Sequence, residues 1–337
     1  MTTQSCKPRV VAAAVFGIVS IGSLVANGPG GEADNGTIWS AKHGTHTTWS
    51  VDTAPGAVAK TVAVATNTGS DVDTAVRDHG DSSKGSVWVV NRDLGELAVF
   101  DAETGAVIST MAVGAGAHDI CISEQVHKAY ITAETINTVT TVDTRTLATE
   151  SIGVGPLPHH IEPSNDGHTI YVSLASHTAT VGSPQLAVID TDDNSVTFIG
   201  TSSNPAARSH GPYPSADGGK VYVAHDLGNE LSRIDVETGD IDFSITPIPR
   251  AEEVIPTRSG SQLWVSSRGD GTVKRIDLNT HTVDSVSVGV QPESVMLTPS
   301  ERTLVVSLAR EPGRSGLRRY GQPFRRAGRD RRRRNVW

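Results

Sequence analysis

Apolar and polar positions alternate along this chain in short runs that turn-forming residues separate. In residues 221–239 the apolar run Val221–Val223 gives way to turn formers around Gly228, and a second alternating run ends at Asp235. Short alternating runs predict β-strands, and a glycine-containing turn between two of them predicts a hairpin. The segment is therefore expected to form a β-hairpin followed by a second turn.

The same unit recurs at a nearly constant period. Five copies place an aromatic residue 13 positions before an aspartate: Trp39 and Asp52, Trp88 and Asp101, Tyr130 and Asp143, Tyr222 and Asp235, Trp264 and Asp277. In a sixth copy, Tyr171 to Asp190, six additional residues lengthen the hairpin loop, and Val305 takes the aromatic position in a partial seventh copy. A period near 40 residues made of short strands is typical of a β-propeller, in which each period is one four-stranded blade.

The repeats predict an all-β fold, a β-propeller with a seven-bladed pattern and an incomplete last blade. The pattern stops in the middle of a unit, after the strand expected at 302–308. The alternative is six closed blades, in which residues 293–298 supply the inner strand that the first blade lacks. We favour seven, because residues 303–308 would otherwise be half of a hairpin. The recurrent aspartates are expected to bind the backbone of the turns that follow them.

The two ends of the chain differ from the repeats, which span about residues 36–310. Lys7 and Arg9 precede an apolar run from Val10 to Ala26, so residues 1–26 resemble a secretory signal peptide. We therefore expect a secreted, extracellular or cell-envelope protein. The run is short for a spanning helix, so membrane association is expected only if the segment stays uncleaved.

Charge separates an acidic body from a basic tail. The whole chain has a formal net charge of −8, whereas residues 311–337 hold ten arginines against Glu311 and Asp330, a local +8. Residues 1–310 therefore carry −8 − 8 = −16. An acidic body argues against nucleic acid as its partner. The tail lacks β alternation and is predicted to be disordered, with a basic arm for nucleic acid or another anionic polymer as the alternative.

The unit at 222–239, YVAHDLGNELSRIDVETG, resembles the repeat of the YVTN-type β-propeller family. The runs IYVSLASH at 170–177 and Pro-His-His at 158–160 are similar to it as well. The resemblance covers about residues 36–310 and implies a secreted or cell-surface seven-bladed propeller. Its blades are similar to those of lactonase-like propellers and of the d1-haem domain of nitrite reductases, so it implies no particular reaction.

Blade topology predicts that equivalent residues of different repeats meet at one end of the central channel. In an up-and-down blade, the loop that enters the inner strand and the hairpin loop between the second and third strands open on the same face. Residues 12 positions before each aromatic position should therefore surround the channel mouth. They are His118, His159, His210, Glu252 and Glu293.

These five residues are histidines and glutamates, residue types that serve as ligands for divalent metal ions. Imidazole and carboxylate suit zinc and similar ions, so His118, His159 and His210 are candidate ligands. Glu252 and Glu293 are candidate general bases. The alternative is structural, with each side chain bound to backbone groups of a polar channel wall. His160 follows His159 in an alternating strand and is expected to point between blades.

Two functions follow from this arrangement. The first is a non-enzymatic binding or scaffold module whose channel-mouth face binds a protein, a cell-envelope component or a small ligand. The second is a metal-assisted hydrolase or lyase of lactonase type that uses a divalent ion. We favour the first, because the sequence contains no nucleophile elbow, phosphate-binding glycine loop, HExxH pattern or CxxC pair. A fold alone does not imply a reaction.

Overall fold

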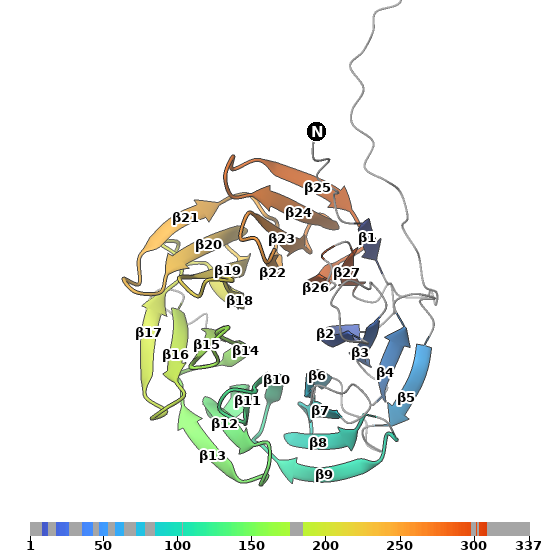
Figure 1. Cartoon of the computed structure of the whole chain (residues 1–337). Coiled ribbons are helices and arrows are strands. Elements are labelled where there is room, and N and C mark those ends of the chain that lie inside the picture. Colours follow the sequence, from blue (N-terminus) through green and yellow to red (C-terminus); the bar gives the residue numbers. More distant parts are fainter. Residues whose placement is uncertain are drawn as a thin grey trace, which may run out of the picture.

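The computed structural model describes residues 85–102, 104–175, 185–297, 301 and 303–308, and the backbone of six earlier strands between residues 9 and 77. The strands form sheets that stand radially around a central axis (Figure 1). This arrangement is the predicted β-propeller. The arginine-rich tail, 311–337, lies outside the described residues.

The described strands form six four-stranded sheets and one three-stranded sheet, which we number as blades 1 to 7. Blade 1 contains β2 (Ile18–Ala26), β3 (Gly36–Lys42), β4 (Thr47–Asp52) and β5 (Val58–Ala63). Blade 2 contains β6 (Val72–Arg77), β7 (Ser86–Asn91), β8 (Glu96–Asp101) and β9 (Val107–Ala112). Blade 3 contains β10 (Ala117–Ser123), β11 (Lys128–Ala133), β12 (Thr138–Asp143) and β13 (Thr149–Gly153). Blade 4 contains β14 (Pro158–Pro163), β15 (Thr169–Leu174), β16 (Gln185–Asp190) and β17 (Val196–Gly200). Blade 5 contains β18 (Arg208–Pro214), β19 (Lys220–Leu227), β20 (Glu230–Asp235) and β21 (Ile241–Ile245). Blade 6 contains β22 (Ala251–Pro256), β23 (Gln262–Ser267), β24 (Thr272–Asp277) and β25 (Val283–Ser287). Blade 7 contains β26 (Pro292–Leu297), β27 (Thr303–Leu308) and β1 (Arg9–Ala12).

The N-terminal segment contributes to two blades. Strand β1 pairs in parallel with β27, and β2 pairs with β3 as the innermost strand of blade 1. The sequence pattern did not reveal this inner strand, because residues 18–26 lack the aromatic and turn signals of the repeat. Strand β26 belongs to blade 7, so the six-bladed closure that would place residues 293–298 in blade 1 is wrong. Cleavage of residues 1–26 stays a prediction.

The hydrophobic core lies between neighbouring blades, where the second strands of blades 2 to 7 are buried on both faces. Trp88, Tyr130, Tyr171 and Trp264, which define the repeat, are at most 1% exposed. Trp88 of blade 2, for example, belongs to a cluster that includes residues of blade 3. Each sheet is too thin to bury both of its apolar faces alone, so the ring is the stable unit. In the described part of the chain the one helix is the 3-10 turn η1 (Glu134–Ile136), and no helix there is long and apolar enough to cross a membrane.

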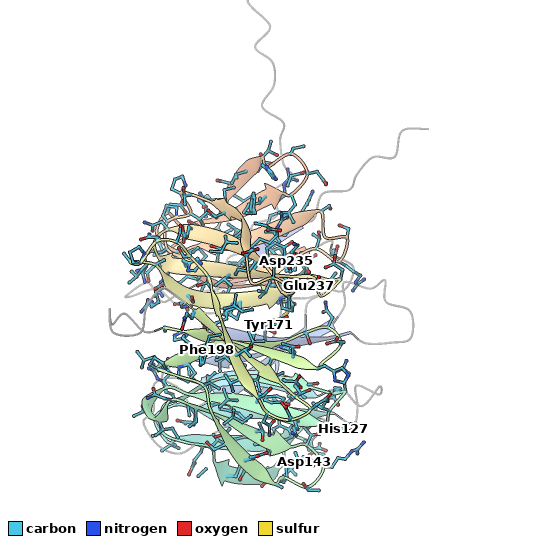
Figure 2. The ribbon with its side chains drawn as sticks, turned by 90° about the vertical axis from the view of Figure 1, so that its left-hand side faces the viewer. His127, Asp143, Tyr171, Phe198, Asp235 and Glu237 are labelled. Carbon is cyan, nitrogen blue, oxygen red and sulfur yellow. The ribbon has the colours of Figure 1, made fainter. Side chains whose placement is uncertain are left out.

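The recurrent aspartate stabilises the turn between the third and fourth strands, as predicted. Oδ1 of Asp143 accepts hydrogen bonds from the backbone N–H groups of Arg145 at 2.9 Å and Thr146 at 2.7 Å. Equivalent bonds are made by Asp101, Asp190, Asp235 and Asp277. Figure 2 shows the ring from the side, with Asp143 and His127 toward the same face. In blade 3, Asp143 pairs with Lys128 at one end of β11, whereas Ala117 at the start of the inner strand pairs with Ala133 at the other end. These turns therefore open on the face opposite the predicted channel mouth.

The inner strands of blades 3 to 7 each begin with a register shift, which is typical of a β-bulge. In blade 3 the shift lies between Ala117 and Ile120, and the N–H group of Asp119 donates to Oγ1 of Thr132 at 3.0 Å. Serine hydroxyls accept the equivalent N–H groups in three other blades, in the pairs His160 and Ser173, Glu253 and Ser266, and Ser294 and Ser307. These bulges set the directions of the side chains at the channel mouth.

Candidate metal centre

The starts of five inner strands bring the five predicted residues into a continuous chain of contacts. The ring centroids of His118 and His159 are 4.0 Å apart, and those of His159 and His210 are 4.8 Å apart. Nε2 of His210 lies 2.9 Å from Oε2 of Glu252. These residues are 41 to 51 positions apart in the sequence, so only closure of the blades into a ring brings them together.

Arg268 connects the last two of these residues. Its Nη1 lies 3.3 Å from Oε1 of Glu252, and its Nη2 lies 3.1 Å from Oε1 of Glu293. Both candidate general bases are therefore ion-paired with the same guanidinium. Although burial alone would raise the pKa of Glu252, His210 and Arg268 lower it to about 2. Glu252 is consequently a weak proton acceptor near neutral pH.

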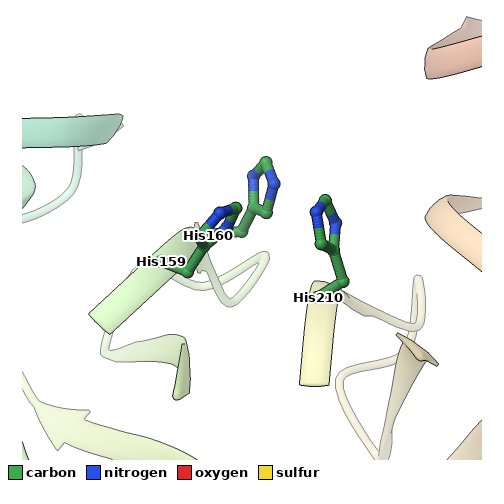
Figure 3. Close-up of side chains that lie close together, drawn as sticks. All are labelled: His159, His160 and His210. Carbon is green, nitrogen blue, oxygen red and sulfur yellow. The ribbon is translucent and has the colours of Figure 1, made fainter. Parts of the chain in front are cut away.

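His160 points between blades, as expected, since its Nδ1 lies 3.0 Å from Oδ2 of Asp119 in blade 3, but it also lies among the other imidazoles, which the sequence did not predict. Its ring centroid is 4.5 Å from those of both His159 and His210 (Figure 3). The physical reason is the bulge between Pro158 and Ile161, which interrupts the alternation of side-chain directions. We refer to His118, His159, His160 and His210 as the histidine cluster.

Two overlapping groups of side chains offer ligand atoms within 4.8 Å of one another. The first is His159, His160 and His210, and the second is His118, Glu134 and His159. Nitrogen ligands at 2.0–2.1 Å from a tetrahedral zinc ion lie roughly 3.3 Å apart. Ligand atoms up to 4.8 Å apart would therefore approach one another by up to about 1.5 Å to share a zinc ion.

Burial favours neutral imidazole rings at His118, His159 and His210. It is the largest cause that lowers the pKa of His118 and of His159 well below 6.5, and neighbouring imidazoles add to the effect. Burial also lowers the pKa of His210, although the hydrogen bond and charge of Glu252 act in the opposite direction. Neutral imidazole is the form of histidine that binds metal ions.

His210 faces an oxygen atom of Glu252 at both of its ring nitrogens. Nδ1 lies 2.9 Å from the main-chain oxygen of Glu252, and Nε2 lies 2.9 Å from the carboxylate oxygen. A carbonyl and an ionised carboxylate only accept hydrogen bonds. Both contacts are favourable only when each nitrogen carries either a proton or a metal ion.

Two buried nitrogen atoms of the cluster have no hydrogen-bond partner among the described residues. They are Nδ1 of His118 and Nδ1 of His159. A buried polar atom without a partner costs about 1–3 kcal/mol, and a bound ion is one explanation for such atoms. The donor set of the cluster therefore fits a metal ion that accepts imidazole nitrogen.

Arginine side chains surround the histidine cluster, each paired with a more buried carboxylate. Arg92 pairs with Glu134, which itself lies 3.6 Å from Nε2 of His159, and Arg208 pairs with Asp226. Arg92 and Arg208 are 39% and 27% exposed, whereas Glu134 and Asp226 are 9% and 1% exposed. The carboxylates therefore lie beneath the guanidinium groups.

Sequence reasoning did not identify Asp119, Glu134 or Arg208 as residues of this centre. Arg208 lies two positions before His210, and Glu134 begins the hairpin loop of blade 3, so neither occupies the repeat position that was used. A search over all polar residues near the start of each inner strand would have included Asp119 and Arg208.

Comparison with known proteins supports the fold and leaves the activity open. No protein-family model and no curated protein matches this chain. Among solved structures, hydrazine synthase from Kuenenia stuttgartiensis is 18% identical with a TM-score of 0.67, and covers 91% of this chain and 96% of its own. A second match is a catalytically inactive histidine-to-alanine variant of virginiamycin B lyase from Staphylococcus aureus with quinupristin. It is 15% identical with a TM-score of 0.64, and the match covers 88% of this chain and 90% of the lyase chain. A structure of the mitotic checkpoint complex matches at 12% identity and a TM-score of 0.70, over 91% of both chains. At these identities the matches show the β-propeller fold alone.

Proposed function

We propose that this chain is a ligand-binding β-propeller that holds a divalent transition-metal ion at its channel mouth through His159, His160 and His210. The observation that carries the proposal is the convergence of three imidazoles from two blades, with ligand atoms within 4.8 Å of one another. His159 and His210 are 51 positions apart in the sequence, so their convergence depends on closure of the ring and not on local structure.

The protonation of His210 supports a metal ion at its Nε2 atom. The main-chain oxygen of Glu252 fixes the proton on Nδ1, as outer-shell acceptors do for metal-binding histidines. Nε2 then needs a cation opposite the carboxylate of Glu252, and burial disfavours a second proton on the ring. A divalent ion satisfies Nε2 and the carboxylate at once.

The donor set indicates which ions to expect. Imidazole nitrogens suit zinc, copper, nickel and iron, whereas calcium and magnesium prefer oxygen ligands. Four imidazoles lie close together here, and the nearby carboxylates of Glu134 and Glu252 are paired with arginines. Zinc or a similar ion is therefore the cofactor that we propose, and a small ligand at the mouth is the partner. Secretion, predicted from residues 1–26, is part of the same proposal.

A metal-assisted lyase or hydrolase is the second candidate function. It is supported by the fold shared with virginiamycin B lyase, for which a histidine-to-alanine variant is described as catalytically inactive. A bound ion would polarise a carbonyl group or activate water. Of the two candidate bases, Glu293 is the more accessible, with 17% of its side chain exposed against 3% for Glu252.

Metal analysis of the purified full chain tests the proposal. The protein is stripped with a chelator, titrated with Zn²⁺, Co²⁺ or Ni²⁺, desalted and analysed for metal content. We expect one ion per chain in the wild type, none in the His159→Ala, His210→Ala double variant, and one in His168→Ala, whose side chain is 57% exposed on a distant turn. A folded wild type that retains no ion contradicts metal binding.

Turnover of lactones and cyclic esters separates the two candidate functions. The metal-loaded wild type, the stripped wild type and metal-treated His159→Ala are compared on the same panel of substrates. Turnover that depends on both the ion and His159 favours the lyase or hydrolase. A metal-loaded protein without turnover on the panel favours the binding function.

A further inference from the structure

Asp119 of blade 3 reaches across to the histidine cluster from the inner strand β10. Its Oδ2 lies 3.0 Å from Nδ1 of His160 in blade 4, and it also accepts the backbone N–H of Ile161 at 3.0 Å. Its Oδ1 accepts the N–H of Ile120 at 2.7 Å. The side chain is 13% exposed, so the carboxylate has a fixed position.

The contact between Asp119 and His160 determines which ring nitrogen of His160 carries a proton. An ionised carboxylate only accepts hydrogen bonds, so Nδ1 must be the donor in this pair. In the neutral ring, Nε2 then has the free lone pair. Nε2 is therefore the atom that His160 offers to an ion held with His159 and His210.

A second blade makes the same inter-blade contact without a histidine. Glu253 occupies the position in blade 6 that Asp119 occupies in blade 3, two residues after the first residue of the inner strand. Its Oε2 accepts the N–H of Val295 at 3.2 Å, as Asp119 does for Ile161, and its Oε1 accepts the hydroxyl of Ser294 at 3.1 Å. The carboxylate clamp between blades is thus a repeated feature, and contact with an imidazole distinguishes Asp119 from Glu253.

We propose that Asp119 is a positioning residue of the metal centre, which holds His160 in the Nδ1–H tautomer and directs Nε2 to the ion. This inference rests on the proposed metal site. A carboxylate that accepts the second N–H of a metal-bound histidine fixes its tautomer and orientation, and its loss typically lowers metal affinity about 10–100-fold.

The tautomer of His160 can be measured without any metal. Long-range ¹H–¹⁵N spectra of the chelator-treated wild type report which nitrogen of each neutral histidine is protonated, and a His160→Gln variant assigns the signals. We expect the Nδ1–H tautomer for His160 in the wild type. In Asp119→Asn, whose amide can donate to Nδ1, we expect a shift toward the Nε2–H tautomer. The Nε2–H tautomer in the wild type would overturn the proposal.

Metal affinity gives a second readout with a matched control. Co²⁺ and Zn²⁺ dissociation constants are measured for the wild type, Asp119→Asn and Glu253→Gln by competition with a chelator. Both variants replace one carboxylate of an inter-blade clamp with an amide, and only Asp119→Asn alters a contact with an imidazole. We expect about 10–100-fold weaker binding for Asp119→Asn and a smaller loss for Glu253→Gln, whose carboxylate acts on His160 and His210 only through its charge. Equal losses in both variants would overturn the positioning role.

The two measurements distinguish failure of this inference from failure of the proposed function. If the wild type binds metal and Asp119→Asn binds it equally well, the positioning role is wrong and the metal site stands. If the wild type binds no metal, the metal site and the positioning role at it are both wrong, and the tautomer then reports only a structural contact.

Discussion

The hydroxyl group of Thr132 in blade 3 donates a hydrogen bond of 2.7 Å to the main-chain oxygen of His159 in blade 4. The hydroxyl oxygen of Thr132, Oγ1, also accepts the N–H of Asp119 at the bulge of its own blade, at 3.0 Å. Ser266 makes the equivalent pair of contacts with Glu293 and Glu253. One small hydroxyl side chain therefore joins the bulge of one blade to the inner strand of the next.

Replacement of Thr132 by valine should destabilise the propeller. Valine preserves the shape of the side chain but leaves a buried N–H and a carbonyl oxygen without this partner, which costs about 1–3 kcal/mol. Urea denaturation monitored by tryptophan fluorescence measures the free energy of unfolding. Thr132→Ser, which keeps the hydroxyl, is the control and should lose less than the valine variant. Equal stability of Thr132→Val and the wild type would show that the contact contributes nothing.

The metal-free protein should lose stability as the pH falls below about 6.5. The lowered pKa values of His118, His159 and His210 mean that the unfolded chain binds protons below pH 6.5 that the folded chain does not bind. The free energy of unfolding therefore decreases as the pH falls, by up to about 1.4 kcal/mol per pH unit for each histidine. The pKa of Glu252 is about 2 in the folded chain and 4.5 when unperturbed, so this residue lowers the stability further as the pH falls from 4.5 to 2. Glu253, whose pKa is raised by burial, acts in the opposite direction above pH 4.5.

Urea denaturation in the presence of a chelator at pH 7.5, 6.5 and 5.5 measures this dependence. His159→Gln removes one titrating ring and should reduce the slope of stability against pH. His168→Gln alters an exposed histidine and should preserve the slope. A free energy of unfolding that stays constant between pH 7.5 and 5.5 would contradict neutral, buried histidines.

The sequence predicted the features of the fold that repeat. Buried aromatic residues such as Trp88 and Trp264 recur because each blade must fill the same gap against its neighbour, and Asp143 and its equivalents recur because each turn has the same unpaired N–H groups. Equal spacing from these positions was enough to predict that His118, His159 and His210 meet at one end of the channel. The inner strand of blade 1 was not predicted, because its residues do not follow the repeat.

The details of the candidate site could not be predicted from alternation. A bulge changes the direction of a side chain without a distinct signal in the hydrophobic pattern, so His160 and Asp119 were not assigned to the cluster. A weak signal does exist, since Thr132, Ser173, Ser266 and Ser307 all lie two residues after an aromatic position. Hydroxyl groups in a buried strand need a partner, and here the partner is the N–H group of the bulge.

Replacement of Arg268 by methionine should destabilise the channel mouth. Arg268 is the shared partner of Glu252 and Glu293, whose side chains are 3% and 17% exposed. Without the guanidinium, two partly buried carboxylates lose a compensating charge. Because a quarter of the Arg268 side chain is exposed, solvent screens part of this interaction, and we expect the free energy of unfolding to fall by about 2 kcal/mol. Thermal and urea denaturation measure the change. Arg258→Met, on a turn at the opposite face, is the comparison, and an equally small loss in both variants would show that the bridge contributes little.

Replacement of Gly211 by alanine should lower the stability and disturb the proposed metal site. Gly211 occupies the bulge of blade 5, and a Cβ atom there would lie 2.9 Å from the main-chain oxygen of Glu252 and 3.2 Å from the Cα atom of Glu253. That oxygen is the acceptor for Nδ1 of His210, so its displacement weakens the orientation of a proposed ligand. Since the obstructing atoms are backbone atoms of the next inner strand, we expect a loss of about 1–3 kcal/mol and weaker Zn²⁺ binding.

Gly153→Ala is the matched control for this substitution. Gly153 ends the outer strand β13, and an added Cβ atom there has no neighbour within 4 Å. Its stability should stay within about 0.5 kcal/mol of the wild type, and its Zn²⁺ affinity should not change. If Gly211→Ala instead binds Zn²⁺ as the wild type does, the main-chain oxygen of Glu252 does not orient a ligand, and His210 must contribute to the centre in another way or not at all. If Gly211→Ala loses affinity at unchanged stability, the close approach of blades 5 and 6 contributes to the proposed metal site rather than to the stability of the fold.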